Sequence, residues 1–268
     1  MQTILDKIQL KYHTLSKTEK KIANYVMTHN QELLNIHIKE LASKIEVSDA
    51  AITRFCKKIG AANFVEFKIL LRDAVKETNT TNDAISTVNS IYESVIQSTN
   101  TLTKMETYQE ACDWILQANK IHVFGLGSSG LSGEELKFRL SRMGLNISAY
   151  VDSHSMIIAS SILTENDVVI AISSSGQTKE ILEAVELANR KKANIISITN
   201  YAETPLTNHS DLALYTSSIN RYQALGFLNS QLSILYSLDI LSMLLTENQT
   251  YMKAYQETLH ALDEYKKI

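Results

Sequence analysis

The sequence predicts two domains of different class, an all-α N-terminal domain joined to a three-layer α/β domain with a five-stranded parallel sheet. Apolar residues recur at helical spacing up to about Lys76. From Ile121 onward, short β-branched runs alternate with helical patterns, which is typical of a parallel sheet covered on both faces. Between them, Lys76–Ser90 is rich in Thr, Asn and Ser and predicts a boundary. The expected division is 1–76 for the helical domain, 77–105 for a linker and helix, and 106–268 for the α/β domain.

The five expected strands are short apolar runs, each followed by a turn or a helical pattern. They are "IHVFGLG" (121–127), "NISAYV" (146–151), "DVVIAIS" (167–173), "NIISIT" (194–199) and "DLALYT" (211–216). The pattern returns to helix from about Leu225. The stretch Leu225–Leu245 is strongly apolar, but Asn229, Gln231 and Asp239 interrupt it, so a buried or interface helix is favoured over a membrane span.

The composition is that of an ordinary globular protein, with 44% hydrophobic and 21% charged residues. Cys56 and Cys112 cannot form a disulfide framework, and neither belongs to a closely spaced metal-binding pair. The first residues contain no apolar core of the kind a signal peptide needs. We therefore expect a cytoplasmic protein without a metal and without a cofactor.

Charge is divided unevenly along the chain. Residues 1–76 contain 13 Lys and Arg against 8 Asp and Glu, a net charge of +5, whereas residues 77–268 contain 13 against 21, a net charge of −8. A basic N-terminal domain on an acidic body indicates that only the N-terminal domain meets a polyanion.

The segment His37–Gly60 has the pattern of two helices joined by a tight turn, with Val47 packed in the turn and Ser48 as the N-cap of the second helix. The apolar stripe of the first helix is Ile38, Leu41, Ala42 and Ile45. The apolar stripe of the second is Ile52, Phe55, Cys56 and Ile59. This is the spacing of a helix-turn-helix motif.

The exposed face of the second helix has small residues at its N-terminal end and basic residues behind them. Small side chains let a helix enter the major groove of DNA, arginine can reach base edges, and lysines neutralise phosphates. The candidate DNA-binding residues are Ser48, Asp49, Ala50, Thr53, Arg54, Lys57 and Lys58. A solvated basic face, or a surface that contacts protein, is the alternative interpretation.

Hydroxyl residues follow the third expected strand in "SSSGQT" (173–178), where a helix begins. Ligands of parallel α/β sheets bind where strands end and helix amides point outward. The candidate phosphate donors are the hydroxyls of Ser173, Ser175 and Thr178. Ser174 and Gln177 are candidates for a sugar or main-chain contact. The turn contains no lysine, which argues against a nucleoside-triphosphate loop, although simple helix capping remains the alternative.

A second turn, "GLGSSG" (125–130), follows the first expected strand and adds Ser128 and Ser129. It formally fits the dinucleotide-binding pattern G-x-G-x-x-G, which is a weak signal. Two serine-lined turns on strands of one sheet fit a compact phosphosugar better than an extended dinucleotide.

Two resemblances cover nearly the whole chain. The segment Leu15–Leu71, with "LSKTEKKIANYV", "VSDAAITRFCKKIG" and "FVEFKILL", closely resembles the N-terminal domain of RpiR-family transcriptional regulators. The segment from about Cys112 to Leu245, with "VFGLGSSG" and "DVVIAISSSGQTKEILEAV", resembles the SIS (sugar isomerase) domain. The family often has Gly-Phe after the second helix of the motif, where this chain has "GAANF". Gly60 is kept as the expected C-cap, so we expect little consequence.

The resemblance implies a DNA-binding regulator that senses a phosphorylated sugar and controls carbohydrate-metabolism genes as a homodimer or homotetramer. It places Ser48, Thr53, Arg54 and Lys57 at the DNA-reading helix. It assigns the phosphate to Ser129, with Ser128 beside it, and to Ser173, Ser175 and Thr178.

The alternative function is a sugar-phosphate isomerase or lyase with an accessory helical domain. SIS enzymes often take a glutamate from the stretch before the long C-terminal helix, and "TSSINRYQALGFLNS" (216–230) contains no acidic residue. His154 and His209 are isolated histidines near turns, and Glu180 is placed to favour a helix dipole. We therefore expect no catalytic residue. Leu225–Leu245 and Tyr251–Tyr265 are the candidate contacts between copies of the chain.

Overall fold

The computed structural model describes residues 3–76, 84–217 and 231–266. Contacts divide the chain into two compact units. The first contains Met1–Leu102, Asn200–Glu203 and Ser217–Ser233, and the second contains Thr103–Thr199, Thr204–Thr216 and Ile234–Ile268. Among the residues described, no helix is long and apolar enough to cross a membrane.

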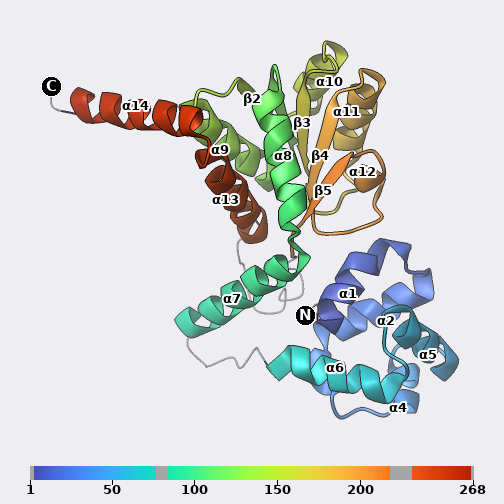
Figure 1. Ribbon diagram of the computed structural model, residues 1–268. Coiled ribbons are helices and arrows are strands. Elements are labelled where there is room, and N and C mark those ends of the chain that lie inside the picture. The colour runs from blue at the N-terminus through green and yellow to red at the C-terminus, as the bar shows by residue number, and fades with distance from the viewer. Residues whose placement is uncertain (1–2, 77–83, 218–230, 267–268) are drawn as a thin grey trace. The chain divides into compact units, whose positions relative to one another are not determined.

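The first unit is helical, as its sequence pattern predicts (Figure 1). Its elements are α1 (Ile4–Lys11), the short 3-10 helix Tyr12–Thr14, α2 (Lys17–Thr28), α3 (Asn30–Leu33), α4 (Ile38–Lys44), α5 (Asp49–Lys58), α6 (Phe64–Lys76) and α7 (Ala84–Leu102). Helices α1 to α6 bury one apolar core, whose largest fully buried side chains include Phe55 and Phe67. Ser16 caps α2 through a reciprocal pair of hydrogen bonds with Glu19, which satisfies amides at the start of that helix.

The predicted two-helix motif corresponds to α4 and α5. Leu41 of α4 is fully buried, and Val47 in the turn packs against the same core. The apolar stripe of α5 is buried throughout its length, at Ile52, Phe55, Cys56 and, just past its end, Ile59. Gly60 follows with a φ of +93°, a left-handed conformation that glycine adopts readily and that ends the helix.

The second unit contains one parallel sheet with the strand order β2-β1-β3-β4-β5. The strands are β1 (Ile121–Gly125), β2 (Ile147–Tyr150), β3 (Val168–Ile172), β4 (Asn194–Thr199) and β5 (Leu212–Tyr215). All five predicted strands are confirmed. Strands β1 and β3 are buried at every position, which explains why both read as continuous apolar runs.

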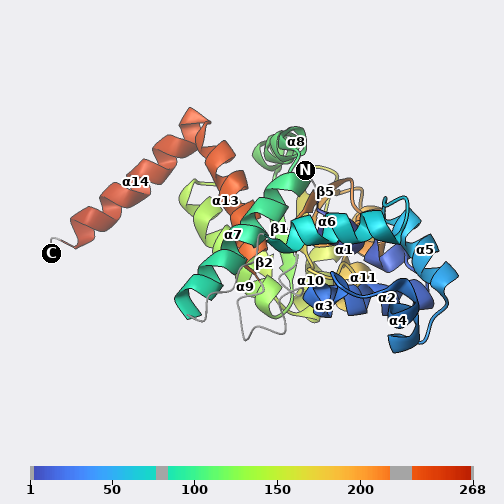
Figure 2. The same cartoon turned by 90° about the horizontal axis from the view of Figure 1, so that it is seen from below.

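Helices cover both faces of this sheet and complete the three layers (Figures 1 and 2). One face packs against α8 (Met105–Gln117), α9 (Ser128–Arg142) and α13 (Leu232–Thr246). The other packs against α10 (Ser153–Ser161), α11 (Lys179–Arg190) and α12 (Pro205–Asn208). The last helix, α14, spans Gln249–Tyr265.

The predicted apolar helix Leu225–Leu245 corresponds to α13 from Leu232 onward, and its part up to Ser230 lies outside the described residues. Ile234, Leu238, Leu241 and Leu245 are fully buried at helical spacing against the sheet. This face of α13 is therefore part of the core of its own chain.

Candidate functional site

The two serine-containing turns begin side by side at the carboxyl ends of two neighbouring strands, β1 and β3. Gly125, the last residue of β1, pairs in register with Ile172, the last residue of β3. In the order 2-1-3-4-5, chain connections leave β1 and β3 in opposite directions, and the crevice between such strands is where open α/β sheets bind ligands. The predicted site thus lies at the topological switch point of the fold.

The first turn brings α9 directly onto the end of β1. A Cβ added at Gly125 would lie 2.7 Å from the carbonyl oxygen of Ser129, so only glycine allows this approach. Ser128 is exposed in the first turn of α9, while Ser129 is 9% exposed. Gly127 occupies the N-cap position of α9 with a φ of +55°. Because glycine has no side chain to cap the helix, the first amides of α9 stay accessible to a ligand.

The second turn is closed by its own hydroxyl groups. The Oγ atom of Ser173 lies 3.0 Å from Oγ1 of Thr178 and accepts a hydrogen bond from the amide of Gly176 at 3.2 Å. The amide of Gln177 donates to Oγ of Ser175 at 3.2 Å. Ser173 is buried, whereas Ser175 and Gln177 are exposed, so the turn has a fixed base and accessible upper side chains.

Helix capping does not account for these hydroxyls. Thr178 occupies the N-cap position of α11, but its side chain makes no capping hydrogen bond and instead lies against Ser173. The first amides of α11 therefore keep the partial positive charge that favours an anion. Phosphate oxygens could accept hydrogen bonds from such amides and from the exposed hydroxyl of Ser175.

Gly176 makes the turn possible. Its φ is +63°, and a Cβ at this position would lie 2.4 Å from Oγ1 of Thr204. Thr204 is fully buried and caps the short helix α12, so it has little room to move. The carbonyl of Gly176 also accepts a hydrogen bond from the amide of Leu206 at 3.1 Å. The segment that follows β4 thus holds the turn in place through Thr204 and Leu206.

The candidate DNA-binding residues lie on and before α5, as predicted. Oγ of Ser48 accepts a hydrogen bond from the amide of Ala51 at 3.2 Å and so caps the helix. Ala50, Arg54 and Lys57 are exposed, Asp49 and Thr53 are partly buried, and the Thr53 hydroxyl donates to the carbonyl of Asp49 at 3.0 Å. Arg54, Lys57 and Lys58 are therefore all exposed, and Arg54 and Lys57 lie three residues apart on the same face of α5.

Lys58 differs from its neighbours because it is held within the first unit. Its ammonium donates to Oε2 of Glu19 and to the carbonyl of Thr14, both at 2.9 Å. Burial alone would raise the pKa of Glu19, but hydrogen bonds from Lys58 and Ser16 bring that pKa below its ordinary value. The ammonium of Lys58 therefore joins α5 to α2 through an ion pair, which leaves it less available to a DNA phosphate.

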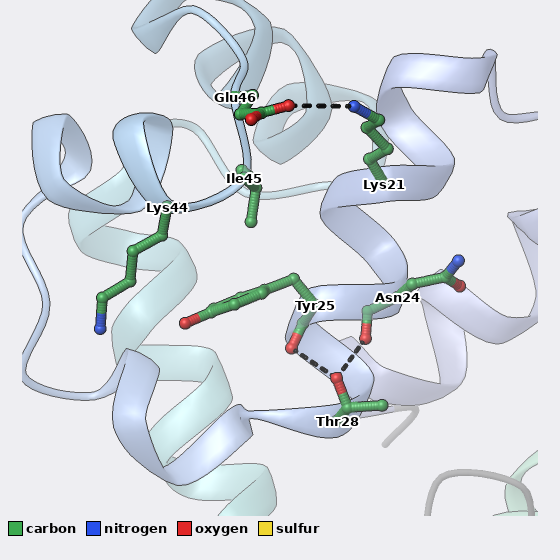
Figure 3. Close-up of a pocket in the computed structure, with 7 residues that line it drawn as sticks. All are labelled: Lys21, Asn24, Tyr25, Thr28, Lys44, Ile45 and Glu46. Atoms are coloured by element: carbon green, nitrogen blue, oxygen red, sulfur yellow. Dashed lines mark hydrogen bonds and ion pairs between the residues drawn. The ribbon is translucent and has the colours of Figure 1, made fainter.

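A separate pocket of about 350 Å³ lies between α2 and the α4–α5 turn, and the sequence pattern did not predict it (Figure 3). It is lined by Lys21, Asn24, Tyr25, Thr28, Lys44, Ile45 and Glu46. Both of its lysines already face carboxylates, since Lys21 lies 4.0 Å from Glu46 and Lys44 pairs with Glu32. The Thr28 hydroxyl is satisfied by the carbonyls of Asn24 and Tyr25. These pairings disfavour the pocket as an anion site.

The two turns carry no acid–base side chain of their own. Neither "GLGSSG" nor "SSSGQT" contains a carboxylate or a histidine. Glu180 is exposed in the first turn of α11, and His154 is exposed at the start of α10. His209 lies 3.7 Å from Glu186 on the surface. Residues 218–230, most of the stretch without acidic residues before the long C-terminal helix, lie outside the described residues.

Two family models match separate parts of the chain. A helix-turn-helix domain of the rpiR family matches residues 2–78, and an SIS domain matches residues 114–244. The chain belongs to the RpiR family. This confirms the resemblance of both segments that was inferred from sequence.

Relatives with helix-turn-helix regulator names align along almost the full chain. One from Caldanaerobacter subterraneus is 28% identical and covers 100% of this chain and 97% of its own length. One from Haemophilus influenzae is 27% identical and covers 97% and 96%. Among solved structures, Vibrio vulnificus NanR complexed with ManNAc-6P matches with a TM-score of 0.65 and 25% identity, covering 98% of both chains. The sugar isomerase domain of an RpiR transcription factor from Sphaerobacter thermophilus shares the fold, with a TM-score of 0.60 and 17% identity over 66% of this chain and 98% of its own.

Proposed function

We propose that the protein is a transcriptional regulator whose α/β domain binds a phosphorylated sugar and whose helical domain binds operator DNA, thereby controlling carbohydrate-metabolism genes. In this proposal residues 1–76 bind DNA, residues 106–268 bind the effector, and residues 77–105 join them. The regulator acts in the cytoplasm. It acts as a homodimer or homotetramer, because one recognition helix reads only a few base pairs and useful affinity needs paired half-sites.

The observation that supports the sugar-phosphate site is the hydroxyl-closed turn Ser173–Thr178 at the β1/β3 switch point. Ser173 and Thr178 form its base, and Ser175 offers an exposed donor. Ser128 and Ser129 contribute from the first turn, whose strand ends beside β3. Ser174 and Gln177 contact the sugar or the main chain. The NanR relative was solved with ManNAc-6P, which makes phosphorylated amino sugars the first class to test.

We further propose that the bound sugar is not converted. Isomerisation needs a base within hydrogen-bond reach of the carbon-bound proton. Carboxylates and histidines are missing from both turns. Solved structures named as sugar-phosphate or phosphosugar isomerases nevertheless share the fold of this domain, so turnover is a question for direct measurement.

At the DNA, Arg54 reads a base edge and Lys57 neutralises a phosphate, while Ser48, Asp49, Ala50 and Thr53 allow α5 to enter the major groove. Lys58 contributes less, because Glu19 holds it.

The experiment is a thermal-shift panel of sugar phosphates on the full chain, with the dephosphorylated sugars and inorganic phosphate as controls. A sugar phosphate that raises the melting temperature, where its free sugar does not, supports the site. The same sample, followed by NMR at catalytic protein concentration, should show no conversion. No shift with any phosphorylated hexose, amino sugar or disaccharide would contradict the proposal.

A further inference from the structure

The outer surfaces of α9 and α13 enclose a groove that the sugar site does not use. It has a volume of about 670 Å³, and α14 borders its far end through Met252 and Tyr255. The walls come from three helices of the second unit: Glu135, Phe138, Arg139, Arg142 and Met143 of α9 and its end, Asp239, Ser242, Met243 and Thr246 of α13, and Met252 and Tyr255 of α14. Phe138 is 61% exposed and Met243 is 70% exposed, so large apolar side chains face solvent here.

Arg142 is the unusual member of this groove. Its guanidinium carbon lies 4.8 Å from the ring centre of Tyr255 and 5.8 Å from that of Phe138. Nε and Nη2 are buried and have no hydrogen-bond partner among the described residues. A buried guanidinium with unpaired nitrogens is costly unless an anion reaches it. By contrast, the neighbouring Arg139 is paired with Glu135 and Asp239.

Helix α14 carries one apolar stripe, of which only the N-terminal half packs against the core of its own chain. Tyr251 and Tyr255 pack partly against the core, and a Cβ added at Gly144 would lie 3.6 Å from Cβ of Ala254. At helical spacing the same stripe continues through Leu259, Leu262 and Tyr265, which are 41%, 49% and 76% exposed. Figures 1 and 2 both show this half of α14 extending away from α9 and α13.

The charge of this exposed half is opposite to that of Arg142. Residues 256–265 contain Glu257, Asp263 and Glu264 and no Lys or Arg. Glu257 lies near Lys253, and Glu264 lies near His260, each one helical turn away. Asp263 follows Leu259 by four residues and therefore lies at the edge of the apolar stripe.

We propose that the exposed half of α14 of one copy docks into the α9–α13 groove of a second copy, with Asp263 of the docked helix paired with Arg142. The exchange is reciprocal, so one two-fold interface fills both grooves. Leu259 and Leu262 cover Phe138 and Met243, as in other helix-in-groove contacts. The carboxylate reaches Nε and Nη2 once the ring of Phe138, the more exposed of the two covering rings, turns aside. This goes beyond the proposed function, because it assigns the contact between copies to specific residues.

The test compares two adjacent substitutions on α14 in the full chain. Leu262→Asp changes the stripe, and Ala261→Asp introduces the same charge on an exposed neighbour off the stripe. Light scattering after gel filtration should give twice the 30.1 kDa chain mass for the wild type and for Ala261→Asp. Leu262→Asp should raise the dimer dissociation constant at least about tenfold. A monomeric wild type, or equal dissociation constants for Leu262→Asp and wild type, overturns the proposal.

A double-mutant cycle tests the ion pair separately. Asp263→Asn and Arg142→Gln should each weaken the dimer several-fold, and the double variant should be little worse than either single variant, because both remove one interaction. Circular dichroism of each monomer excludes simple unfolding. Fully additive effects would show that Asp263 does not meet Arg142. If Phe138→Asp dissociates the dimer but Leu262→Asp does not, the groove is filled by another element and the commitment to α14 is wrong.

Discussion

The hydroxyl oxygen of Ser173 lies 3.0 Å from that of Thr178, so the serine turn is closed by the residues at its two ends. Ser173 also accepts from the amide of Gly176, which makes it a structural member of the turn. Ser175 is different, because it is exposed and its Oγ receives only a local amide bond from Gln177 among the contacts described. We therefore expect substitution of Ser175 to change ligand affinity alone, and substitution of Ser173 to change both ligand affinity and stability.

Ser175→Ala should weaken sugar-phosphate binding by about 1.5–3 kcal/mol, since it removes a donor to a charged acceptor. Its melting temperature without ligand should stay that of the wild type. Isothermal titration with the best sugar phosphate of the panel measures the loss. Ser161→Ala, an exposed serine on α10, is the matched control and should bind normally. Unchanged affinity of Ser175→Ala would remove this serine from the site.

Ser173→Ala should lower both affinity and stability. The substitution leaves the amide of Gly176 without its side-chain acceptor and Thr178 without its partner, and a lost buried hydrogen bond costs about 1–2 kcal/mol. Urea unfolding of Ser173→Ala beside Ser175→Ala separates the two roles. Equal unfolding free energies for the two variants would contradict the structural role assigned to Ser173.

Gly176→Ala should damage the turn more than either serine change. The methyl group meets Oγ1 of Thr204 at 2.4 Å, and a φ of +63° is unfavourable for alanine. We expect a loss of about 1–3 kcal/mol in unfolding free energy and loss of ligand binding. Combining it with Thr204→Ser removes one of the methyl contacts and should recover part of the stability. Full stability and binding in Gly176→Ala would mean that the turn can rearrange freely.

The DNA-binding face should show a graded response across three cations. Arg54→Ala should cost about 1–3 kcal/mol at the cognate operator if it reads a base edge. Lys57→Ala should weaken binding to all sequences and reduce the salt slope by about one. Lys58→Ala should affect DNA least, because Lys58 already pairs with Glu19. Fluorescence anisotropy with operator and scrambled duplexes measures all three. A larger loss for Lys58→Ala than for Arg54→Ala would place the DNA elsewhere on the first unit.

His122 predicts a pH dependence of stability. Burial, with a smaller contribution from Lys120, lowers its pKa from 6.5 to about 4. Its ring centre lies 5.6 Å from that of Tyr150, on which it stacks, and its buried Nδ1 has no hydrogen-bond partner among the residues that the structure describes. The unfolded chain therefore takes up this proton at higher pH than the folded chain, so stability falls from pH 6.5 towards pH 4 and this contribution is constant below that.

The expected size of the His122 effect is about 2–4 kcal/mol across that window. Urea unfolding at several pH values should show a shallower slope for His122→Phe, which keeps the ring stack, than for the wild type. His154→Gln, at an exposed position, should keep the wild-type slope. Parallel slopes for wild type and His122→Phe would show that His122 is not buried in its neutral form.

The fold could be predicted from sequence because the strongest signals were local. Continuous β-branched runs gave all five strands, and the stripe Ile52–Phe55–Cys56–Ile59 gave the buried face of α5. The resemblance implied that the two serine turns share one ligand, but the register that pairs Gly125 with Ile172 could not be predicted from the residue pattern, because strand order depends on non-local contacts. The ion pair of Lys58 with Glu19 was missed for the same reason, since 39 residues separate them. The groove around Arg142 could not be predicted either, because its walls come from three helices and no sequence motif shows that they meet.

The most direct measurement of the central proposal is operator binding by the intact chain with and without the sugar phosphate that the thermal-shift panel selects. In the wild type this ligand should change operator affinity by about 5- to 150-fold, the range expected for allosteric coupling. Ser175→Ala should match the wild type without ligand and show no change at the same ligand concentration. A Ser175→Ala variant that still responds like the wild type, or a wild type whose operator affinity ignores every ligand that binds, would contradict the account.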